Sequence, residues 1–179
     1  MKMKIFLIML SSISTGVCYA ESFSPHSTVA IAHLTNAKGE KVGTATITED
    51  REGVRISIEA SKLPPGQHGI HFHEVGNCSL PDFKAAGSHY GSADREHGLK
   101  NPKGPHTGDL PNVHVSEDGT LKAKIITKTV TLKKGKNSLL KPEGTAIVIH
   151  QGSDDQKSNP AGQSGGRIVC GVVEVVPET

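Results

Sequence analysis

The chain has 179 residues, which favours a single domain, and 20 Lys and Arg against 18 Asp and Glu give it a formal net charge of +2. So small a basic excess argues against a nucleic-acid or anionic-membrane partner. Aromatic residues make up only 3% of the chain and tryptophan is absent, so a surface that stacks on nucleic-acid bases is not expected either.

The first twenty residues have the pattern of an export signal. Lys2 and Lys4 form a basic start, residues 5–10 are an unbroken apolar run, and small and polar residues lead to a cleavage site after Ala20. The apolar run is too short to span a bilayer, which needs about 20 residues. We therefore expect an exported protein without stable membrane insertion.

Removal of residues 1–20 as a signal peptide would leave residues 21–179 as the single mature domain. The removed segment holds two lysines and no acid, so the mature chain would carry 18 basic and 18 acidic side chains. The short signal indicates a bacterium, and the periplasm is then the expected compartment. Secretion and a lipid anchor on Cys18 are the alternatives.

Two of the three cysteines, Cys78 and Cys170, would remain after this cleavage. Disulfides persist in exported proteins, so we expect these two cysteines to pair. In the chain-entropy model, closing a loop of roughly 90 residues in this way stabilises the fold by about 4 kcal/mol. The alternative is a pair of free buried thiols.

Alternation of apolar and polar residues with a period of two predicts strands along most of the chain. Residues 54–59 (VRISIE) alternate cleanly, and the short charged link at residues 49–53 predicts a hairpin with the strand before it. No segment has a convincing amphipathic helical pattern, so an antiparallel sandwich or barrel is expected. In chain order, the predicted strands cover residues 28–34, 42–48, 54–59, 69–75, 113–115, 121–125, 146–150 and 168–176.

Two stretches do not fit the strand pattern. Residues 76–111 are rich in Gly, Pro, Asp and His without periodicity, and residues 151–166 are similar. Structureless loops of this length are uncommon in a compact domain unless they are functional or tethered. A disulfide at Cys78 would tether one end of the first loop, and the histidines of that loop are the remaining candidates for ordering it.

Seven of the ten histidines lie between residues 68 and 114. Strand periodicity places His71 and His73 on one face, where two imidazoles can chelate one ion. This His-x-His pattern alone is a weak signal, because it often arises by chance. It gains weight from the histidines that follow it in the chain.

The first long loop continues with His89, His97, His106 and Asp109, the three histidines being separated by seven and eight residues. Three imidazoles and one carboxylate make a complete tetrahedral zinc shell, which is closed and therefore structural. Such a site would order the loop, because metal binding at a site absent from the unfolded chain contributes folding free energy. The alternative is four solvated side chains on a surface loop. His150 ends an apolar strand next to the second loop, and imidazole-rich sites suit Cu, Zn, Fe or Ni.

Together these features resemble the copper-zinc superoxide dismutases, over roughly Thr28 to Val176. The resemblance is carried by the histidine-rich stretch at residues 66–78, the spacing of the loop histidines and aspartate, His150, and the terminal GGRIVCGVV. It implies an all-β fold, an eight-stranded antiparallel Greek-key barrel or sandwich of immunoglobulin-like type with two long functional loops. It also implies antioxidant disproportionation of superoxide to oxygen and hydrogen peroxide, through alternate reduction and oxidation of a histidine-bound copper.

The resemblance further implies one copper and one zinc per subunit. The copper ligands would be His71, His73, His89 and His150. The zinc ligands would be His89, His97, His106 and Asp109. His89 would thus bridge the two metals, and as a catalytic group it would take up a proton and deliver it to the second superoxide.

Other residues gain roles from the same resemblance. Asp154 would accept hydrogen bonds from two of the histidine ligands and orient both rings. Arg167 would lie beside the open face of the copper and attract the superoxide anion. The disulfide between Cys78 and Cys170 would tie the first loop to the barrel. His68 would be a structural hydrogen-bonding residue, and no ligand role is implied for His26, His33 and His114.

Three other functions are compatible with parts of this pattern. A non-enzymatic copper-binding protein, a store or chaperone on the same fold, would lack some of the ligands or Arg167. An immunoglobulin-like adhesive domain would leave the long loops unexplained, and a zinc hydrolase would need an open zinc position. The expected partner is the small superoxide anion, and the expected state is a monomer or homodimer. Loop lysines that could steer the anion are Lys84, Lys100 and Lys157.

Overall fold

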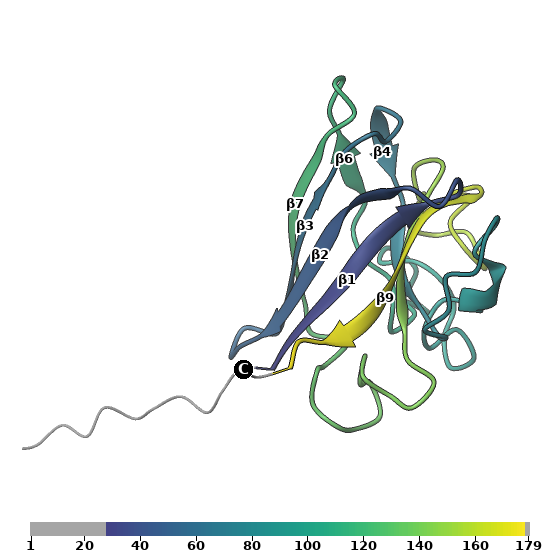
Figure 1. Cartoon of the computed structure of the whole chain (residues 1–179). Helices are drawn as coiled ribbons and strands as arrows, with labels where there is room; N and C mark the ends of the chain where they lie inside the picture. Colours follow the sequence, from purple (N-terminus) through teal and green to yellow (C-terminus); the bar gives the residue numbers. More distant parts are fainter. Residues whose placement is uncertain (1–27, 178–179) are drawn as a thin grey trace, which may run out of the picture.

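The computed structural model describes residues 28–177, in which almost all regular structure is β (Figure 1). The one helical element in this range is the short 3-10 helix η1 (Lys84–Ala86). The nine strands in chain order are β1 (Val29–Asn36), β2 (Lys41–Glu49), β3 (Val54–Ala60), β4 (Gly66–His68), β5 (Ile70–His73), β6 (Val113–Val115), β7 (Leu121–Thr127), β8 (Ala146–His150) and β9 (Arg167–Val175).

Seven of these strands form one antiparallel sheet in the order β5-β8-β9-β1-β2-β3-β7, and β4 pairs with β6 beside it. The large sheet is strongly curved, with β7, β3, β2, β1 and β9 side by side in Figure 1. The prediction of an all-β antiparallel fold is confirmed, and each of the eight predicted strands has a counterpart. The additional strand β4 was missed because Gly66–His68 (GQH) has no apolar residue to alternate with its polar ones.

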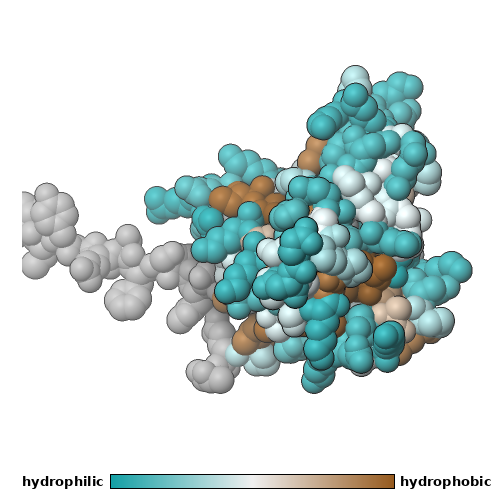
Figure 2. All heavy atoms as spheres, turned by 90° about the horizontal axis from the view of Figure 1, so that it is seen from above, coloured by the Kyte–Doolittle hydropathy of each residue, from teal (hydrophilic) through white to brown (hydrophobic). Residues whose placement is uncertain are grey.

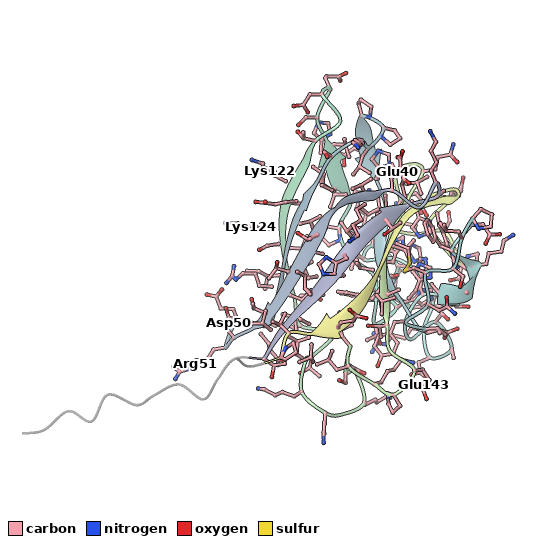
Figure 3. The ribbon with its side chains drawn as sticks, viewed as in Figure 1. Glu40, Asp50, Arg51, Lys122, Lys124 and Glu143 are labelled. Carbon is pink, nitrogen blue, oxygen red and sulfur yellow. A yellow bond between two sulfur atoms is a disulfide. The ribbon has the colours of Figure 1, made fainter. Side chains whose placement is uncertain are left out.

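The alternation of side chains along the strands builds the core. In β3, Val54, Ile56 and Ile58 are buried, whereas the residues between them face outward. Burying each such side chain stabilises the fold by about 1.5–3 kcal/mol relative to leaving it exposed. An Ile56→Ala substitution should therefore destabilise the protein by about 2–5 kcal/mol. On the adjacent strand β7, Lys122 and Lys124 point away from the sheet (Figure 3).

The outer surface is mostly polar. Hydrophilic side chains cover most of the face seen in Figure 2, and apolar residues form small separate patches on it. Within residues 28–177, no helix has the length and apolar character needed to cross a membrane. The export signal predicted at residues 1–20 lies outside the described residues.

A disulfide joins the first long loop to the sheet. Cys78 in this loop and Cys170 on β9 are bonded, with their Cα atoms 5.7 Å apart and a sequence separation of 92. The predicted pairing is confirmed. Both stretches that lacked a strand pattern are indeed long connections, one between β5 and β6 and the other between β8 and β9. We call them the first loop (residues 74–112) and the second loop (residues 151–166).

Candidate metal centre

Three of the predicted ligands lie on two neighbouring strands. His71 and His73 are on β5 and point to the same face, while Phe72 between them packs into the hydrophobic core. His150 ends β8, which pairs with β5 along its length. The backbone N–H of His150 donates to the carbonyl of Gly69 at 2.8 Å, which fixes this strand end beside β5. The sheet ladder thus brings three imidazoles to one place.

The first loop returns twice to the edge of β5. Single β-bridges place His89 and Asp109 opposite the two histidines of β5. Phe72 on β5 accepts a hydrogen bond from the N–H of Tyr90 at 2.8 Å, and its own N–H donates to the carbonyl of Gly108 at 2.9 Å. A side chain at position 108 would collide with the Phe72 carbonyl oxygen, so this close approach requires glycine. The edge of the sheet therefore positions two loop residues of the site.

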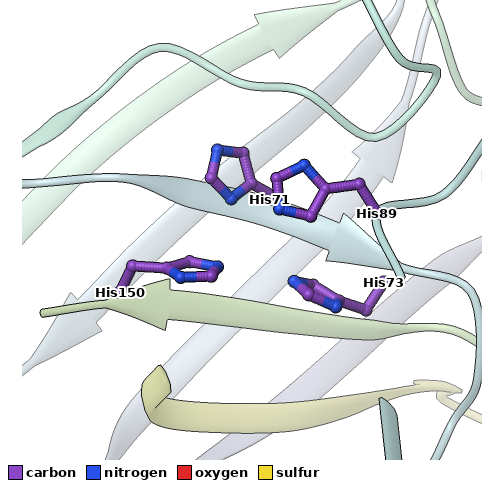
Figure 4. A group of neighbouring side chains, drawn as sticks. All are labelled: His71, His73, His89 and His150. Carbon is purple, nitrogen blue, oxygen red and sulfur yellow. The ribbon is translucent and has the colours of Figure 1, made fainter. Parts of the chain in front are cut away.

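The first cluster consists of four buried histidines (Figure 4). One nitrogen from each ring lies within 4.8 Å of the nitrogens from the others. These four nitrogens have no hydrogen-bond partner in the described structure: His71 Nδ1, His73 Nε2, His89 Nε2 and His150 Nε2. Buried polar atoms without partners are costly, so their convergence calls for a ligand. An all-imidazole donor set fits copper, among other transition metals.

The opposite ring nitrogens are held by hydrogen bonds. His73 Nδ1 lies 3.0 Å from the carbonyl oxygen of Gly87, and His150 Nδ1 lies 3.2 Å from that of Gly165. Such bonds fix the orientation of a metal-binding ring and decide which nitrogen carries the proton. In both rings the nitrogen left free faces the cluster.

The second cluster is centred on one carboxylate oxygen. Oδ1 of Asp109 lies 3.1 Å from His89 Nδ1, 3.0 Å from His97 Nδ1 and 3.5 Å from His106 Nδ1. Three imidazole nitrogens and one carboxylate oxygen are the donors of a closed tetrahedral zinc shell. Because the other nitrogen of His89 belongs to the first cluster, this ring lies between the two clusters.

His71 is also within 4.8 Å of three members of the second cluster. Its Nε2, however, already lies 2.6 Å from Asp154 Oδ2, and its free Nδ1 belongs to the first cluster. By contrast, His106 Nδ1 is buried without a hydrogen-bond partner and lies 3.5 Å from Asp109. His106 therefore fits the second cluster better than His71 does.

Asp154, in the second loop, forms hydrogen bonds with one histidine of each cluster. Its carboxylate accepts from Nε2 of His71 at 2.6 Å and from Nε2 of His97 at 3.0 Å. Asn112 holds the main chain of Asp154: the Asn112 amide donates to its carbonyl at 2.8 Å and accepts from its N–H at 2.9 Å. Asn112 could not be singled out from the sequence, because a loop amide has no distinctive chemical signature.

The two clusters differ in their electrostatics. Burial lowers the pKa of His89 to about 4 and that of His150 to about 3. Burial alone would raise the pKa of Asp109 and Asp154, but hydrogen bonds from histidines hold both below the ordinary carboxyl value. Burial alone would lower the pKa of His97, but hydrogen bonds and charge attraction from Asp109 and Asp154 raise it to about 9. The first cluster therefore offers neutral imidazoles, the form that binds a metal.

Arg167 borders the first cluster. It begins β9 and pairs in register with His150. Its guanidinium donates to the carbonyl oxygens of Phe83 and Gly87, both at 2.6 Å, and the Gly87 carbonyl is also the one that holds His73. Partial burial lowers the pKa of Arg167, but a guanidinium remains charged at neutral pH. The predicted arginine thus lies next to the buried imidazoles with its charge in place.

The remaining histidines lie outside both clusters. His68 is buried, and each of its ring nitrogens lies 2.8 Å from a backbone carbonyl oxygen, one of Pro64 and the other of His150. This is the structural role expected for it. His33 and His114 are exposed, and His26 lies outside the described residues.

The chain is similar to a known family and to several known proteins. A family model described as copper/zinc superoxide dismutase (SODC) matches residues 41–173. The chain is 51% identical over 145 residues to superoxide dismutase [Cu-Zn] 1 of Aquifex aeolicus, a match that covers 80% of this chain and 86% of the relative.

Two solved structures are similar to this fold. A superoxide dismutase-like protein from Bacillus subtilis has a TM-score of 0.76 and 43% identity, covering 79% of this chain and 96% of that one. The Cu/Zn superoxide dismutase from Brucella abortus has a TM-score of 0.66 and 28% identity, covering 82% of this chain and 99% of that one.

Proposed function

Because the chain belongs to the copper/zinc superoxide dismutase family, we propose that it disproportionates superoxide at the two joined clusters. In this reaction two superoxide anions and two protons give one dioxygen and one hydrogen peroxide. The observation that carries the proposal is the convergence of four buried, unpartnered imidazole nitrogens that His89 links to a carboxylate-centred cluster.

The donor sets assign the two metals. Copper would be held by His71, His73, His89 and His150, and zinc by His89, His97, His106 and Asp109. Copper held there would supply the one-electron redox chemistry that the reaction needs, whereas zinc has no redox chemistry. Zinc would have four protein ligands, so its contribution would be to fix the His89 ring and the first loop.

Arg167 is the residue that would bind the anion. A guanidinium carries five N–H donors, and its two terminal nitrogens already donate to the carbonyls of Phe83 and Gly87. These bonds fix the charge next to the first cluster before substrate arrives, so little reorganisation is needed. The remaining N–H groups can donate to superoxide.

His89 is the residue that would move a proton. Its Nε2 is buried and without a hydrogen-bond partner, while its Nδ1 faces Asp109 in the second cluster. The ring is therefore held on one side, and its Nε2 would take up a proton only when it does not hold copper. A positioned imidazole of this kind acts as a general acid, donating the proton to the reduced anion.

We also propose export to the periplasm. The named relatives are bacterial, and the disulfide between Cys78 and Cys170 would persist in an oxidising compartment.

The exposed Lys84, Lys100 and Lys157 are candidates for local steering of superoxide, and Lys84 is paired with Asp82 at 2.8 Å.

A copper store or chaperone on the same fold is less well supported. Such a protein would have gaps in its ligand sets, whereas all seven ligands and Arg167 are present in this chain. A zinc hydrolase would need an open zinc position, and the second cluster has four donors.

The decisive experiment is superoxide decay, followed by pulse radiolysis, for protein loaded with one copper and one zinc. We expect fast decay that disappears when copper alone is removed. Slow decay with both metals bound would support the storage or chaperone function instead. A matched control is protein loaded with zinc only, which should show no catalysed decay.

A further inference from the structure

His97 is held in a different way from its neighbours in the second cluster. Neither His97 nor His106 belongs to a strand or β-bridge of the described structure. The N–H of His106 donates to the nearby Asp109 at 3.0 Å, within the same loop. The N–H of His97 instead donates to Oδ1 of Asn159, in the second loop, at 2.8 Å.

The two loops approach closely at this point. Gly98, with a φ of +110°, lies against the backbone carbonyl of Gln156, and a side chain at position 98 would collide with it. The same carbonyl accepts from the N–H of Lys100 at 3.0 Å. The buried side chain of Gln156 donates to the carbonyl of Leu110 at 3.2 Å. The segment that carries His97 is therefore packed directly on the second loop.

Hydrogen bonds hold every polar part of His97. Asn159 accepts from its N–H, and the amide of Asn101 donates to its carbonyl at 3.0 Å. Its ring donates through Nε2 to Asp154, which is also in the second loop. The second loop thus contacts both the main chain and the ring of a residue that belongs to the first loop.

We propose that Asn159 is a positioning residue for the second cluster, because its side chain fixes the main chain of His97 and so the place of His97 Nδ1. This inference rests on the proposed assignment of zinc to that cluster. Without the Asn159 acceptor, the His97 segment would sample more conformations, and binding a metal would require ordering it. Asn159 itself is exposed, so its substitution opens no cavity in the core.

Three variants test the role of Asn159. Asn159→Ala removes the acceptor, whereas Asn159→Asp keeps an oxygen at the same position. Lys157→Gln is the matched control, since Lys157 is exposed in the same loop and only its backbone forms hydrogen bonds in the described structure, donating to Asp155 and accepting from Asn101. The readouts are the zinc affinity of copper-free protein, measured by competition with a chelator, and the visible spectrum of Co²⁺ bound in place of zinc.

We expect Asn159→Ala to weaken zinc binding roughly threefold to tenfold, the factor that loss of one ordinary hydrogen bond produces. Asn159→Asp should bind within about twofold of the parent protein, because the acceptor remains. Lys157→Gln should match the parent. The spectrum of bound Co²⁺ should also shift in the Asn159→Ala protein. In this variant, zinc binding should slow hydrogen exchange of the backbone amides of residues 151–166 less than it does in the parent protein.

A merely structural role for Asn159 makes a different prediction. In that case Asn159→Ala would lower the unfolding midpoint of the metal-free protein and leave zinc affinity and the Co²⁺ spectrum unchanged, which would overturn the inference. A His97→Ala protein separates this failure from a failure of the zinc assignment. If His97→Ala binds zinc as tightly as the parent, the zinc assignment is wrong, and the role of Asn159 is overturned with it.

Discussion

The two clusters share His89 but are built in opposite ways. Three of the four histidines of the first cluster lie on β5 and β8, whose hydrogen-bond ladder fixes them relative to each other. In the second cluster all four residues come from the first loop, and hydrogen bonds to side chains of the second loop hold part of it. Strand pairing thus positions three of the four residues of the first cluster, whereas the second depends on loop contacts and, in our proposal, on zinc.

Because they are built differently, the two clusters are expected to have different roles. A ladder of strand hydrogen bonds is rigid, which suits a cluster that must keep its geometry through repeated electron transfer. A loop cluster gains most of its order from the metal, and the binding free energy then stabilises the loop. Substitutions in the first cluster should therefore change activity most, and substitutions in the second should change stability and metal affinity most.

The largest effect on activity should follow from the loss of a histidine of the first cluster. His73→Ala removes a copper ligand, and we expect superoxide decay to slow by roughly a thousandfold, about 4 kcal/mol of transition-state stabilisation. Pulse radiolysis with metal analysis measures this, and zinc content should stay at one per chain. His114→Ala is the control, since His114 is exposed outside both clusters. Unchanged decay in the His73→Ala protein would place the reaction elsewhere.

The next largest effect concerns the bond that ties the first loop to β9. Replacing Cys78 and Cys170 by serine together should lower the free energy of unfolding by about 4 kcal/mol in the chain-entropy model. Urea denaturation of the metal-free protein measures this, with reduction of the parent protein as a parallel test. A difference near zero would mean that the disulfide constrains the unfolded chain little.

Substitutions in the second cluster should change the stability of the protein more than its activity. Zinc at roughly 100 times its Kd stabilises a protein by about 2.7 kcal/mol, which corresponds to about 5–10 °C in Tm for a chain of this size. We expect His97→Ala to lose this zinc-dependent rise in Tm and His73→Ala to keep it. Calorimetry with and without zinc makes the comparison, and an equal loss in both variants would contradict the division between the clusters.

Arg167→Ala should have a smaller effect, confined to the rate. Without the fixed guanidinium beside the first cluster, superoxide decay should slow severalfold, while copper and zinc contents remain those of the parent. Arg167→Lys should recover part of the rate, because it restores the charge but not the two bonds to the carbonyls. Normal decay in the alanine variant would remove Arg167 from the mechanism.

A further effect is the pH dependence of the metal-free protein. The pKa of His89 and His150 falls from 6.5 to about 4 and about 3 on folding, so the stability these neutral rings contribute is present above pH 6.5 and lost as the pH falls towards 3. The pKa of His97 rises from 6.5 to about 9, so its contribution is present below pH 6.5 and lost as the pH rises through 9. From these groups we expect a stability maximum near pH 6.5, measurable by urea midpoints between pH 4 and 9. Stability that rises steadily across this range would contradict these shifts.

Much of the fold could be predicted because alternation is a direct consequence of strand geometry. Residues 54–59 show it clearly, and they became β3 with its apolar face buried. The strand β4 escaped prediction, since Gly66–His68 contains no apolar residue and so shows no alternation, unlike the equally short β6 (VHV). The boundaries of β1 and β2 moved by one or two residues, because the ends of strands are set by hydrogen bonds to a neighbour rather than by the residues themselves.

The site residues could be predicted because imidazole and carboxylate groups are few and chemically distinctive, and their spacing matched a known family. The contacts that hold them could not. Gly87 acts through its backbone carbonyl, which any residue would offer. Asn112 and Asn159 act through amides that look like ordinary loop residues in the sequence. Only the arrangement in space shows that their oxygens face the site.

The most direct test of the two-cluster account is a crystal structure of the copper- and zinc-loaded protein, with anomalous diffraction measured at both metal absorption edges. The account predicts copper at Nδ1 of His71 and at Nε2 of the other three histidines of the first cluster, and zinc at Asp109 with His89, His97 and His106. It also predicts that His89 contacts both metals. One metal type at both positions, or a zinc bound by His71 in place of His106, would contradict it.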